Sequence, residues 1–473
     1  MSRGSTRSAT HFFGERHTMD AFATSLRGDL ILPDSEDYDA ARSIWNGMID
    51  RRPGAIARCL GVSDVVKGVN FARENGLELC IRSGGHNISG LAVADDSLVL
   101  DMTRMRGVFV DADRGIAHAQ AGCTLGDVDN ETQVHGLAAV LGFVSATGCA
   151  GLTLGGGFGY MTRKHGWSSD NLRSVTLVTA EGELVRASDN ENPDLFWAVR
   201  GGGGNFGVAV DFEYDLYPVG PQIMAGAIAW TADQSEDVFG LYRELIDSAP
   251  PELTVVLGLR TAPPAPWIDP SAHGKPIVLL LACHTGNLSD GERLVAPIKS
   301  FGSPVGDVIM PRPYVTQQSL LDATQPNGRR YYWKSEYMPS VESDMLDTAW
   351  AHARQAPSPH AATLVFPVDG RLNTLPTEHS AVGNRDARFV LNIAGAWDDT
   401  ADDEANVAWA RAAWDALRGY STGGTYVNFL TEEEGADRIS DAYGPNQARL
   451  EQIKTAWDPT NFFHRNKNIR PAG

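Results

Sequence analysis

Glycine is concentrated in one stretch of the chain, residues 147–159, where the sequence TGCAGLTLGGGFG holds six glycines in thirteen positions. A residue without a Cβ can take positive φ and bring its backbone N–H close to a bound anion, such as a nucleotide pyrophosphate. A Rossmann loop is disfavoured, because that motif needs a G-x-G-x-x-G spacing and an acidic residue about 20 positions later. On this stretch alone, a glycine-rich turn packed against other backbone fits as well as a nucleotide-binding loop.

A second glycine loop lies upstream, at residues 82–90, and reads RSGGHNISG. Together the two loops resemble those of the covalent flavoproteins of the berberine bridge enzyme family, within the vanillyl-alcohol oxidase and p-cresol methylhydroxylase superfamily. The resemblance continues through residues 189–210, 331–337, 425–430 and 443–471 and covers nearly all of the chain after its first 20 or so residues. It implies an α+β fold with a two-part FAD-binding domain of the p-cresol methylhydroxylase type and a substrate domain.

The resemblance also implies FAD as the cofactor, joined through a ring nitrogen of His86 to the flavin 8α-methyl group. In bicovalent members of the family a cysteine at the head of the second loop also bonds flavin C6, and Cys149 is assigned to that position. An unreacted buried thiol is the alternative, because apolar neighbours would raise the pKa of Cys149 and oppose its deprotonation. The remaining flavin contacts are assigned to Arg82, Ser83, Gly84, Gly85, Asn87, Thr147, Gly148, Gly151, Leu152, Gly155, Gly156, Gly157, Gly159, Asn205, Gly207, Val208, Asn428, Asn466 and Asn468.

Length and composition bound the rest of the interpretation. A chain of 473 residues exceeds one simple core and indicates two or three domains. No apolar run approaches the roughly 20 residues of a membrane span. The formal net charge of −19, with no basic cluster, argues against nucleic acid and anionic membrane as partners. We therefore expect a soluble protein, a monomer or homodimer, that acts on a small molecule.

The five cysteines are scattered, odd in number and without a C-x-x-C pair, so neither a disulfide framework nor a metal site is expected. The N-terminal residues have no apolar segment or cleavage site of a secretory signal. Residues 1–18 are therefore interpreted as a disordered extension before a possible start at Met19, and a cytoplasmic location is expected.

Helices and strands alternate around the glycine loops in the first part of the chain. The apolar spacing of residues 63–75 predicts a helix capped by Gly76. Strands on both sides of residues 82–90 place His86 on a loop between them. The other predicted elements are hairpins at residues 107–123 and 172–188, a helix capped by Thr124, and a helix with Asn192 as N-cap and Pro193 in its first turn.

A strictly alternating strand ends near residues 218–220, where a domain boundary is predicted. Beyond it, long strands and amphipathic helices predict an antiparallel sheet covered by helices on one face. The strands are expected at residues 252–260, 276–285, 329–338, 361–368 and 387–397, and the helices near residues 235–247, 289–300, 341–355 and 402–418. The predicted division is an FAD-binding domain at 19–220, a substrate domain at 221–421, and a segment at 422–473 that by resemblance returns to the FAD-binding domain.

The catalytic base is the least determined part of the site. Family members carry a motif like Y-x-N-Y on the substrate side of the flavin, and here Phe429 replaces the second tyrosine. Tyr426 is the first candidate, and Tyr332 and Lys334 on the YYWKSEY strand are the reserve. A tyrosine pKa near 10 must fall by roughly two to three units for work near neutrality, which a nearby Lys334 would achieve. Aromatic packing with a surface ion pair is the alternative for that strand.

These observations predict an FAD-linked oxidase that takes a hydride from an alcohol, hemiacetal or amine carbon of a sugar, alkaloid or other secondary metabolite. Dioxygen would reoxidise the flavin and give hydrogen peroxide. One alternative is a dehydrogenase with another electron acceptor, because the bulky Leu152 is expected where family members control the approach of oxygen. The other is a flavin-binding protein without turnover, favoured only by the missing tyrosine.

Overall fold

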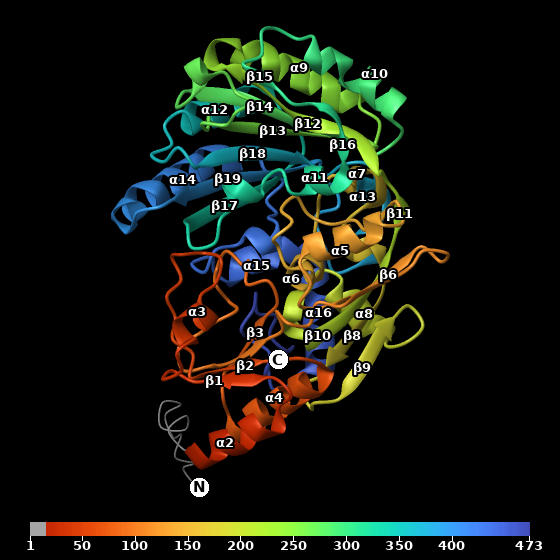
Figure 1. The fold of residues 1–473 in the computed structure, drawn as a ribbon, viewed down its shortest axis with the longest axis vertical. Coiled ribbons are helices and arrows are strands. Elements are labelled where there is room, and N and C mark those ends of the chain that lie inside the picture. The colour runs from red at the N-terminus through yellow and green to blue at the C-terminus, as the bar shows by residue number, and fades with distance from the viewer. Residues whose placement is uncertain (1–15) are drawn as a thin grey trace.

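The computed structural model describes residues 16–473, which build a large sheet with its helices and, beneath it, two smaller sheets of four and five strands (Figure 1). Residues 1–15, most of the predicted extension, lie outside the described part of the chain. The end of that extension is helical, because it begins helix α2 (Arg16–Ser25). Met19 and Phe22 on this helix are buried in the core, and their apolar contacts explain why the chain is ordered there.

A four-stranded sheet with the order β1-β2-β4-β3 carries the first glycine loop. Strands β2, β3 and β4 are parallel, and β1 pairs antiparallel with β2. The loop with His86 connects β3 to β4, as predicted, and Gly76 caps helix α4 with a φ of 62°. The elements of this part are β1 (Asp29–Ile31), α3 (Tyr38–Arg42), β2 (Ala55–Arg58), α4 (Val62–Asn75), β3 (Leu79–Arg82) and β4 (Leu98–Asp101).

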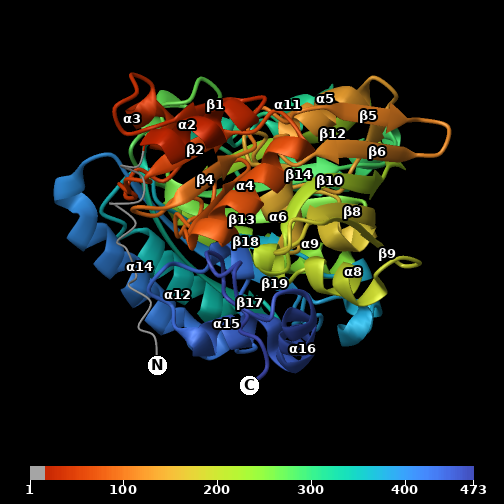
Figure 2. The same ribbon diagram turned by 90° about the horizontal axis from the view of Figure 1, so that it is seen from below.

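A five-stranded antiparallel sheet, β5-β6-β10-β8-β9, lies beside the first sheet (Figure 2). Both predicted hairpins are confirmed, and Thr124 caps α5 through a capping box with Asp127. Asn192 occupies the predicted N-cap position of α8, before Pro193, but its side chain donates to the Arg186 carbonyl and makes no capping hydrogen bond. The elements are β5 (Val108–Asp111), β6 (Ile116–Gln120), α5 (Leu125–Gln133), β7 (Leu137–Ala138), α6 (Cys149–Leu154), α7 (Thr162–His165), β8 (Leu172–Val178), β9 (Leu184–Ser188), α8 (Pro193–Val199), β10 (Val208–Asp215) and β11 (Tyr217–Pro218).

The large sheet is antiparallel throughout, with the order β15-β12-β14-β13-β18-β19-β17, and β16 also pairs with β12. The five predicted strands and the helical cover are confirmed, but β12, β15 and β16 were missed in the sequence. The strands are β12 (Gln222–Thr231), β13 (Leu253–Thr261), β14 (Pro276–His284), β15 (Gly306–Asp307), β16 (Met310–Pro313), β17 (Arg330–Met338), β18 (Ala362–Pro367) and β19 (Phe389–Trp397).

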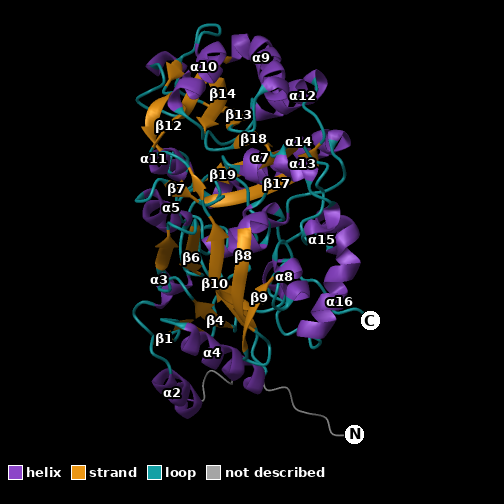
Figure 3. Cartoon of the chain, turned by 90° about the vertical axis from the view of Figure 1, so that its right-hand side faces the viewer, coloured by secondary structure: helices purple, strands orange, loops and turns teal. Residues whose placement is uncertain are grey.

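Helices cover the face of this sheet that is turned away from the smaller sheets (Figure 3). Their apolar residues pack on alternate side chains of the strands in one core cluster. The covering helices are α9 (Ser235–Ser248), α10 (Leu288–Lys299), α12 (Ser343–Ala353) and α14 (Asp403–Leu417), while α11 (Tyr314–Gln318) and α13 (Arg371–Thr374) are short. The predicted α+β architecture is confirmed.

The last part of the chain runs back along the smaller sheets as α15 (Ala436–Tyr443) and α16 (Gln447–Trp457) (Figure 3). A fully buried lysine, Lys454, holds this segment: its Nζ donates to the Asn205 carbonyl at 2.7 Å, to Asp458 at 2.6 Å and to the Phe463 carbonyl at 3.0 Å. The segment after α16 is therefore tied to Asn205, which follows a run of four glycines at residues 201–204. None of the helices described in residues 16–473 is long and apolar enough to cross a membrane.

Candidate active site

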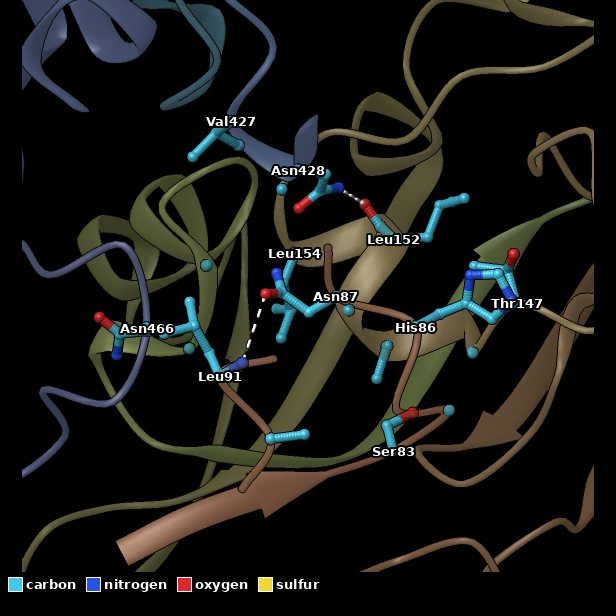
Figure 4. Close-up of a pocket in the computed structure, with 18 of the residues that line it drawn as sticks. Ser83, His86, Asn87, Leu91, Thr147, Leu152, Leu154, Val427, Asn428 and Asn466 are labelled. Atoms are coloured by element: carbon cyan, nitrogen blue, oxygen red, sulfur yellow. Dashed lines mark hydrogen bonds between the residues drawn. The ribbon is translucent and has the colours of Figure 1, made fainter. Parts of the chain in front are cut away.

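A cavity of about 330 Å³ lies between the glycine loops and the large sheet, a volume within the range of small-molecule sites. In Figure 4, His86 and Thr147 lie toward one end of the view, and Leu91 and Asn466 toward the other. The predicted cofactor residues that line the cavity are Ser83, Gly84, Gly85, His86, Asn87, Thr147, Gly148, Gly151, Leu152, Gly155, Asn205, Gly207, Val208, Asn428 and Asn466. Those outside its lining are Arg82, Cys149, Gly156, Gly157, Gly159 and Asn468.

The two glycine loops touch each other through their backbones at Gly84 and Gly148. A Cβ on Gly84 would lie 2.4 Å from the Gly148 nitrogen, and a Cβ on Gly148 would lie 2.4 Å from the Gly84 nitrogen. Real Cβ atoms do not approach so closely, so any side chain would force the loops apart. Both loops therefore present bare backbone to the cavity, which is what close contact with a cofactor requires.

His86 faces the cavity as a neutral imidazole. Its ring stacks on Trp45 with the centroids 4.3 Å apart, and Trp45 in turn stacks on Tyr331 at 3.8 Å. Burial lowers the pKa of His86 to about 4, so the ring carries no charge at neutral pH. Its Nε2 is buried without a hydrogen-bond partner among the residues described, so its hydrogen-bonding capacity is left for a bound molecule.

Cys149 does not line the cavity, which argues against the predicted thioether to the flavin. The residue begins α6 and is completely buried, with its Sγ 3.8 Å from the Gln120 carbonyl oxygen and Tyr214 close by. Burial raises the pKa of the thiol, which keeps it protonated. The cavity is lined instead by Val144 before it and by Ala150 after it. This position favours the alternative that the sequence left open, an unreacted thiol in the core.

Tyr426 and Asn428 lie at the edge of the cavity in the 3₁₀ segment around Val427–Phe429. The Tyr426 Oη accepts two hydrogen bonds, from the Gly157 N–H at 3.0 Å and from Asn428 Nδ2 at 2.9 Å. These donors favour the phenolate, but the larger effect is burial, which raises the pKa of Tyr426. Because both of these bonds are accepted by the oxygen, the O–H proton is left to face a bound molecule.

Tyr332 and Lys334 do not reach the cavity, which corrects their assignment as reserve catalysts. On β17, Trp333 lines the cavity, whereas Tyr332 packs in the core beneath the helices. Lys334 is 4% exposed and lies 3.0 Å from each of Glu433 and Glu434, which raise its pKa by opposing desolvation. The expected lowering of the Tyr426 pKa by Lys334 therefore does not occur; the lysine is in a buried ion pair on the other face of the sheet.

Three asparagines assigned to the flavin differ in what their side chains do. Asn205 donates to the Gly202 and Lys467 carbonyls and accepts from the Ile469 N–H, so it fixes the C-terminal segment. Asn466 lines the cavity with its Oδ1 buried and unpaired within the described part of the chain. The Asn468 Oδ1 is likewise buried and, in residues 16–473, without a hydrogen-bond partner, although the residue does not line the cavity.

The other predicted residues outside the lining shape the loops. Gly159 sits so close to Leu141 that a Cβ would lie 1.8 Å from its carbonyl oxygen, and Gly156 and Gly157 have φ of 111° and 79°. Arg82 donates to the Ala41 carbonyl. These residues hold the turns in shape and do not contribute surface to the cavity.

Sequence reasoning missed Lys467 and the residues that the large sheet contributes. Lys467 lines the cavity, its Nζ donates to Ser89 Oγ at 2.6 Å and to the Thr431 carbonyl at 3.0 Å, and burial lowers its pKa to about 8. Its place between two assigned asparagines was a usable signal. The residues from the sheet could not be found without knowing which strand faces point inward; they are Trp333, Leu364, Phe366, Asn392 and Ala394.

Comparisons with known proteins agree with this geometry. Two family models match, one described as an FAD binding domain at residues 53–188 and one as berberine and berberine like at residues 425–470. The chain is similar to (R)-6-hydroxynicotine oxidase of Paenarthrobacter nicotinovorans, with 33% identity over 95% of this chain and 98% of that protein. It is also similar to an FAD-linked oxidoreductase of Dictyostelium discoideum, with 31% identity over 97% and 98% of the two chains.

Solved structures extend the comparison. A 6-hydroxy-D-nicotine oxidase from Arthrobacter nicotinovorans has a TM-score of 0.85 and 31% identity, with 95% of this chain and 99% of that chain covered. A xylooligosaccharide oxidase from Myceliophthora thermophila has a TM-score of 0.83 at 21% identity, with 96% and 100% covered, which shows the shared fold alone.

Proposed function

The chain belongs to the berberine bridge enzyme family of FAD-linked oxidoreductases, and from that premise we propose that it is an oxidase with FAD attached to His86. Its substrate would be a small molecule with an oxidisable alcohol, hemiacetal or amine carbon. The observation that carries the proposal is the unpaired Nε2 of a neutral His86 in a cavity walled by bare glycine backbone. We further infer that residues 19–220 and 422–473 hold the cofactor and that residues 221–421 supply the substrate side.

The residues at hand fit a flavin nucleotide. Backbone N–H groups of the glycine loops suit a pyrophosphate, and Asn466 has a free side-chain oxygen for a polar edge. The neutral imidazole of His86 has the lone pair that a bond to the flavin 8α carbon would need. When bound, FAD would supply the hydride acceptor and then pass the electrons to dioxygen, which gives hydrogen peroxide.

Tyr426 is proposed to hold the proton that leaves the substrate. Its oxygen already accepts from Gly157 and Asn428, and both donors would stabilise the negative charge that proton loss creates. The rings of Phe158 and Phe429 pack edge-on against Tyr426, each 4.9 Å away between centroids. They keep water from the hydroxyl, so a bound substrate would be its one further polar neighbour besides Gly157 and Asn428.

The electron acceptor is the point on which a second candidate function, a dehydrogenase, differs from the proposed oxidase. Leu152 lines the cavity and packs so tightly on Gly142 and Gly157 that a Cβ on either would come within 2.6 Å of its methyl groups. A bulky, fixed side chain there favours restricted access, so a dehydrogenase with another electron acceptor is the alternative. A carrier without turnover is set aside, since the relatives are oxidoreductases.

Two measurements test the proposal. The purified protein should be yellow, and its flavin should precipitate with the protein in acid; flavin recovered wholly in the supernatant would disprove attachment. A substrate found by screening sugars, alcohols and cyclic amines should bleach the flavin anaerobically. Air should then restore the colour with release of peroxide in equal amount, whereas slow recovery with fast reduction of an artificial dye would favour the dehydrogenase.

A further inference from the structure

The roof of the cavity is an apolar surface interrupted by one carboxamide. Trp333, Leu364, Phe366, Asn392 and Ala394 reach the cavity from three adjacent strands of the large sheet. Their positions follow from register, because Trp333 pairs with Ala394 and Leu364 pairs with Asn392, and paired residues point to the same side of a sheet. Asn392 is therefore the single amide in a patch of aromatic and aliphatic side chains.

The Asn392 side chain is buried without satisfying its hydrogen bonds. It is 2% exposed, and its Oδ1 has no partner in the described chain. Two other polar atoms of residues that line the cavity, the Trp333 Nε1 and the Gln325 Oε1, are also buried and without a partner in residues 16–473. Leaving a buried polar group unpaired costs stability, and most such groups in folded proteins are paired. A ligand that supplies the missing bonds would explain why an amide stands at this position.

The charges around the cavity restrict what that ligand can be. Among the described residues no Asp or Glu lines the cavity, and the charged groups that do, Arg465 and Lys467, come from the C-terminal segment. The charged side chain of β17 that could have faced inward, Lys334, is paired on the opposite face. An ammonium group under the roof would thus be buried without a counter-charge, which favours a ligand that binds in its neutral form.

The shape of the lining restricts the ligand further. Phe143, Phe158, Phe366, Phe429 and Trp333 surround the space with flat apolar surface. A sugar presents several hydroxyl groups, each of which would need a partner when buried, and the roof offers few. A planar molecule with one polar edge would pack against the aromatic walls and offer that edge to the unpaired Asn392 Oδ1.

We propose that Asn392 determines specificity by binding an adjacent hydrogen-bond donor and acceptor on a neutral, planar substrate. A carboxamide has an acceptor and a donor side by side, which is the complement of a lactam or a hydroxy-substituted nitrogen heterocycle. This inference rests on the proposed function, because the substrate would lie between the roof and the flavin. It adds to that function the class of the substrate and the residue that selects it.

The test measures binding of probes to the flavin-loaded protein, without turnover. 2-Pyridone offers the donor–acceptor pair, N-methyl-2-pyridone lacks the donor, and cellobiose carries many hydroxyl groups. Titrations followed by the flavin difference spectrum and by calorimetry should give an affinity for 2-pyridone about 10- to 100-fold higher than for its N-methyl form, as expected when a buried polar group is left unpaired. Cellobiose should bind most weakly.

Asn392→Leu should remove the preference, so that the two pyridones bind with equal affinity. The matched control is Thr363→Val. Like Asn392→Leu, it deletes a buried polar atom that is unpaired within the described residues, here a hydroxyl, but it lies on the helix-covered face of the same sheet. It should retain the wild-type preference. Since the wild-type comparison of the probes needs no variant, the proposal stays testable even if Asn392→Leu folds poorly.

Three results would overturn the inference: no saturable binding of 2-pyridone at millimolar concentration, tighter binding of cellobiose, or an unchanged preference in Asn392→Leu. The proposed function fails separately, through absence of bound flavin in the purified protein. If the enzyme holds flavin and a substrate reduces it, but substitution of Asn392 does not change the preference between the pyridones, the proposed function stands and the inference about Asn392 is wrong.

Discussion

Removal of the Tyr426 hydroxyl tests the proposed chemistry most directly. In Tyr426→Phe the ring still packs against Trp167, to which it lies parallel at 5.7 Å, so the fold should persist. The loss leaves the Gly157 N–H unpaired, whereas Asn428 keeps its second bond to the Leu152 carbonyl at 3.1 Å. One unpaired buried donor costs about 1–3 kcal/mol, so the melting temperature should fall by only a few degrees.

The effect on the reaction should be far larger than the effect on stability. If Tyr426 accepts the substrate proton, the variant should reduce its flavin about 10²- to 10⁴-fold more slowly, as for a lost general base. Because burial raises the pKa of Tyr426, only a small fraction is phenolate near neutrality, and the wild-type rate should rise about tenfold per pH unit. That slope should vanish in the variant.

Anaerobic stopped-flow measurement of flavin reduction between pH 6 and pH 9 distinguishes the possibilities. Tyr332→Phe is the control, since this tyrosine faces the helices, and it should change the rate by less than about threefold. A Tyr426→Phe rate equally close to wild type, with the pH slope intact, would refute the assignment. If Tyr426→Phe is slow but the wild-type rate does not depend on pH, Tyr426 has a hydrogen-bonding role and does not transfer the proton.

Three further predictions follow from buried groups. His86→Ala should release its flavin into the acid supernatant and lose most activity; covalent flavin in that variant would mean attachment elsewhere. Cys149→Ser should keep the flavin bond and the visible spectrum of the wild type, and an altered spectrum would reinstate the thioether. Burial raises the pKa of Asp129 from 3.8 to about 7, so the folded state favours the protonated acid and its stability advantage is lost as pH rises from 4 through 7. Asp129→Asn should therefore gain up to about 4 kcal/mol over wild type between pH 4 and pH 8, and a melting-temperature difference that does not change with pH would contradict this.

Elements set by local patterns were predictable from the sequence. The helix that ends at Gly76, the two hairpins and the capping box at Thr124 all depend on residues within a few positions of one another. Five strands of the large sheet were found for the same reason; the short strands β15 and β16 were missed, and so was the long strand β12. Its sequence, QIMAGAIAWT, follows the predicted boundary directly and consists mainly of small apolar residues that alternate too weakly to mark a strand.

The site was predictable only where it is made of backbone. Glycine-rich loops can be recognised from composition, but the direction in which a side chain points depends on tertiary packing. On β17, both faces mix aromatic and polar residues, so the pattern does not tell whether Trp333 or Lys334 faces the cavity. A shift of one residue in the register of the strand would exchange the side chains that face the cavity for those that face the helices. In the same way, the position of Cys149 at the start of α6 turns its thiol into the core, while the next residue, Ala150, lines the cavity.

The ion pairs behind the sheet explain how residues that never touch the cavity still serve it. Lys334 binds Glu433 and Glu434, and the Glu434 carboxylate also accepts from the Thr431 N–H at 3.0 Å. These bonds fix the chain just after the segment that carries Tyr426, while Gly157 fixes its hydroxyl from the other side. Breaking a buried ion pair leaves an uncompensated charge, so the arrangement resists local opening. A tyrosine held at both ends in this way keeps its hydroxyl in a fixed position at the edge of the cavity, although Lys334, Glu433 and Glu434 do not line it.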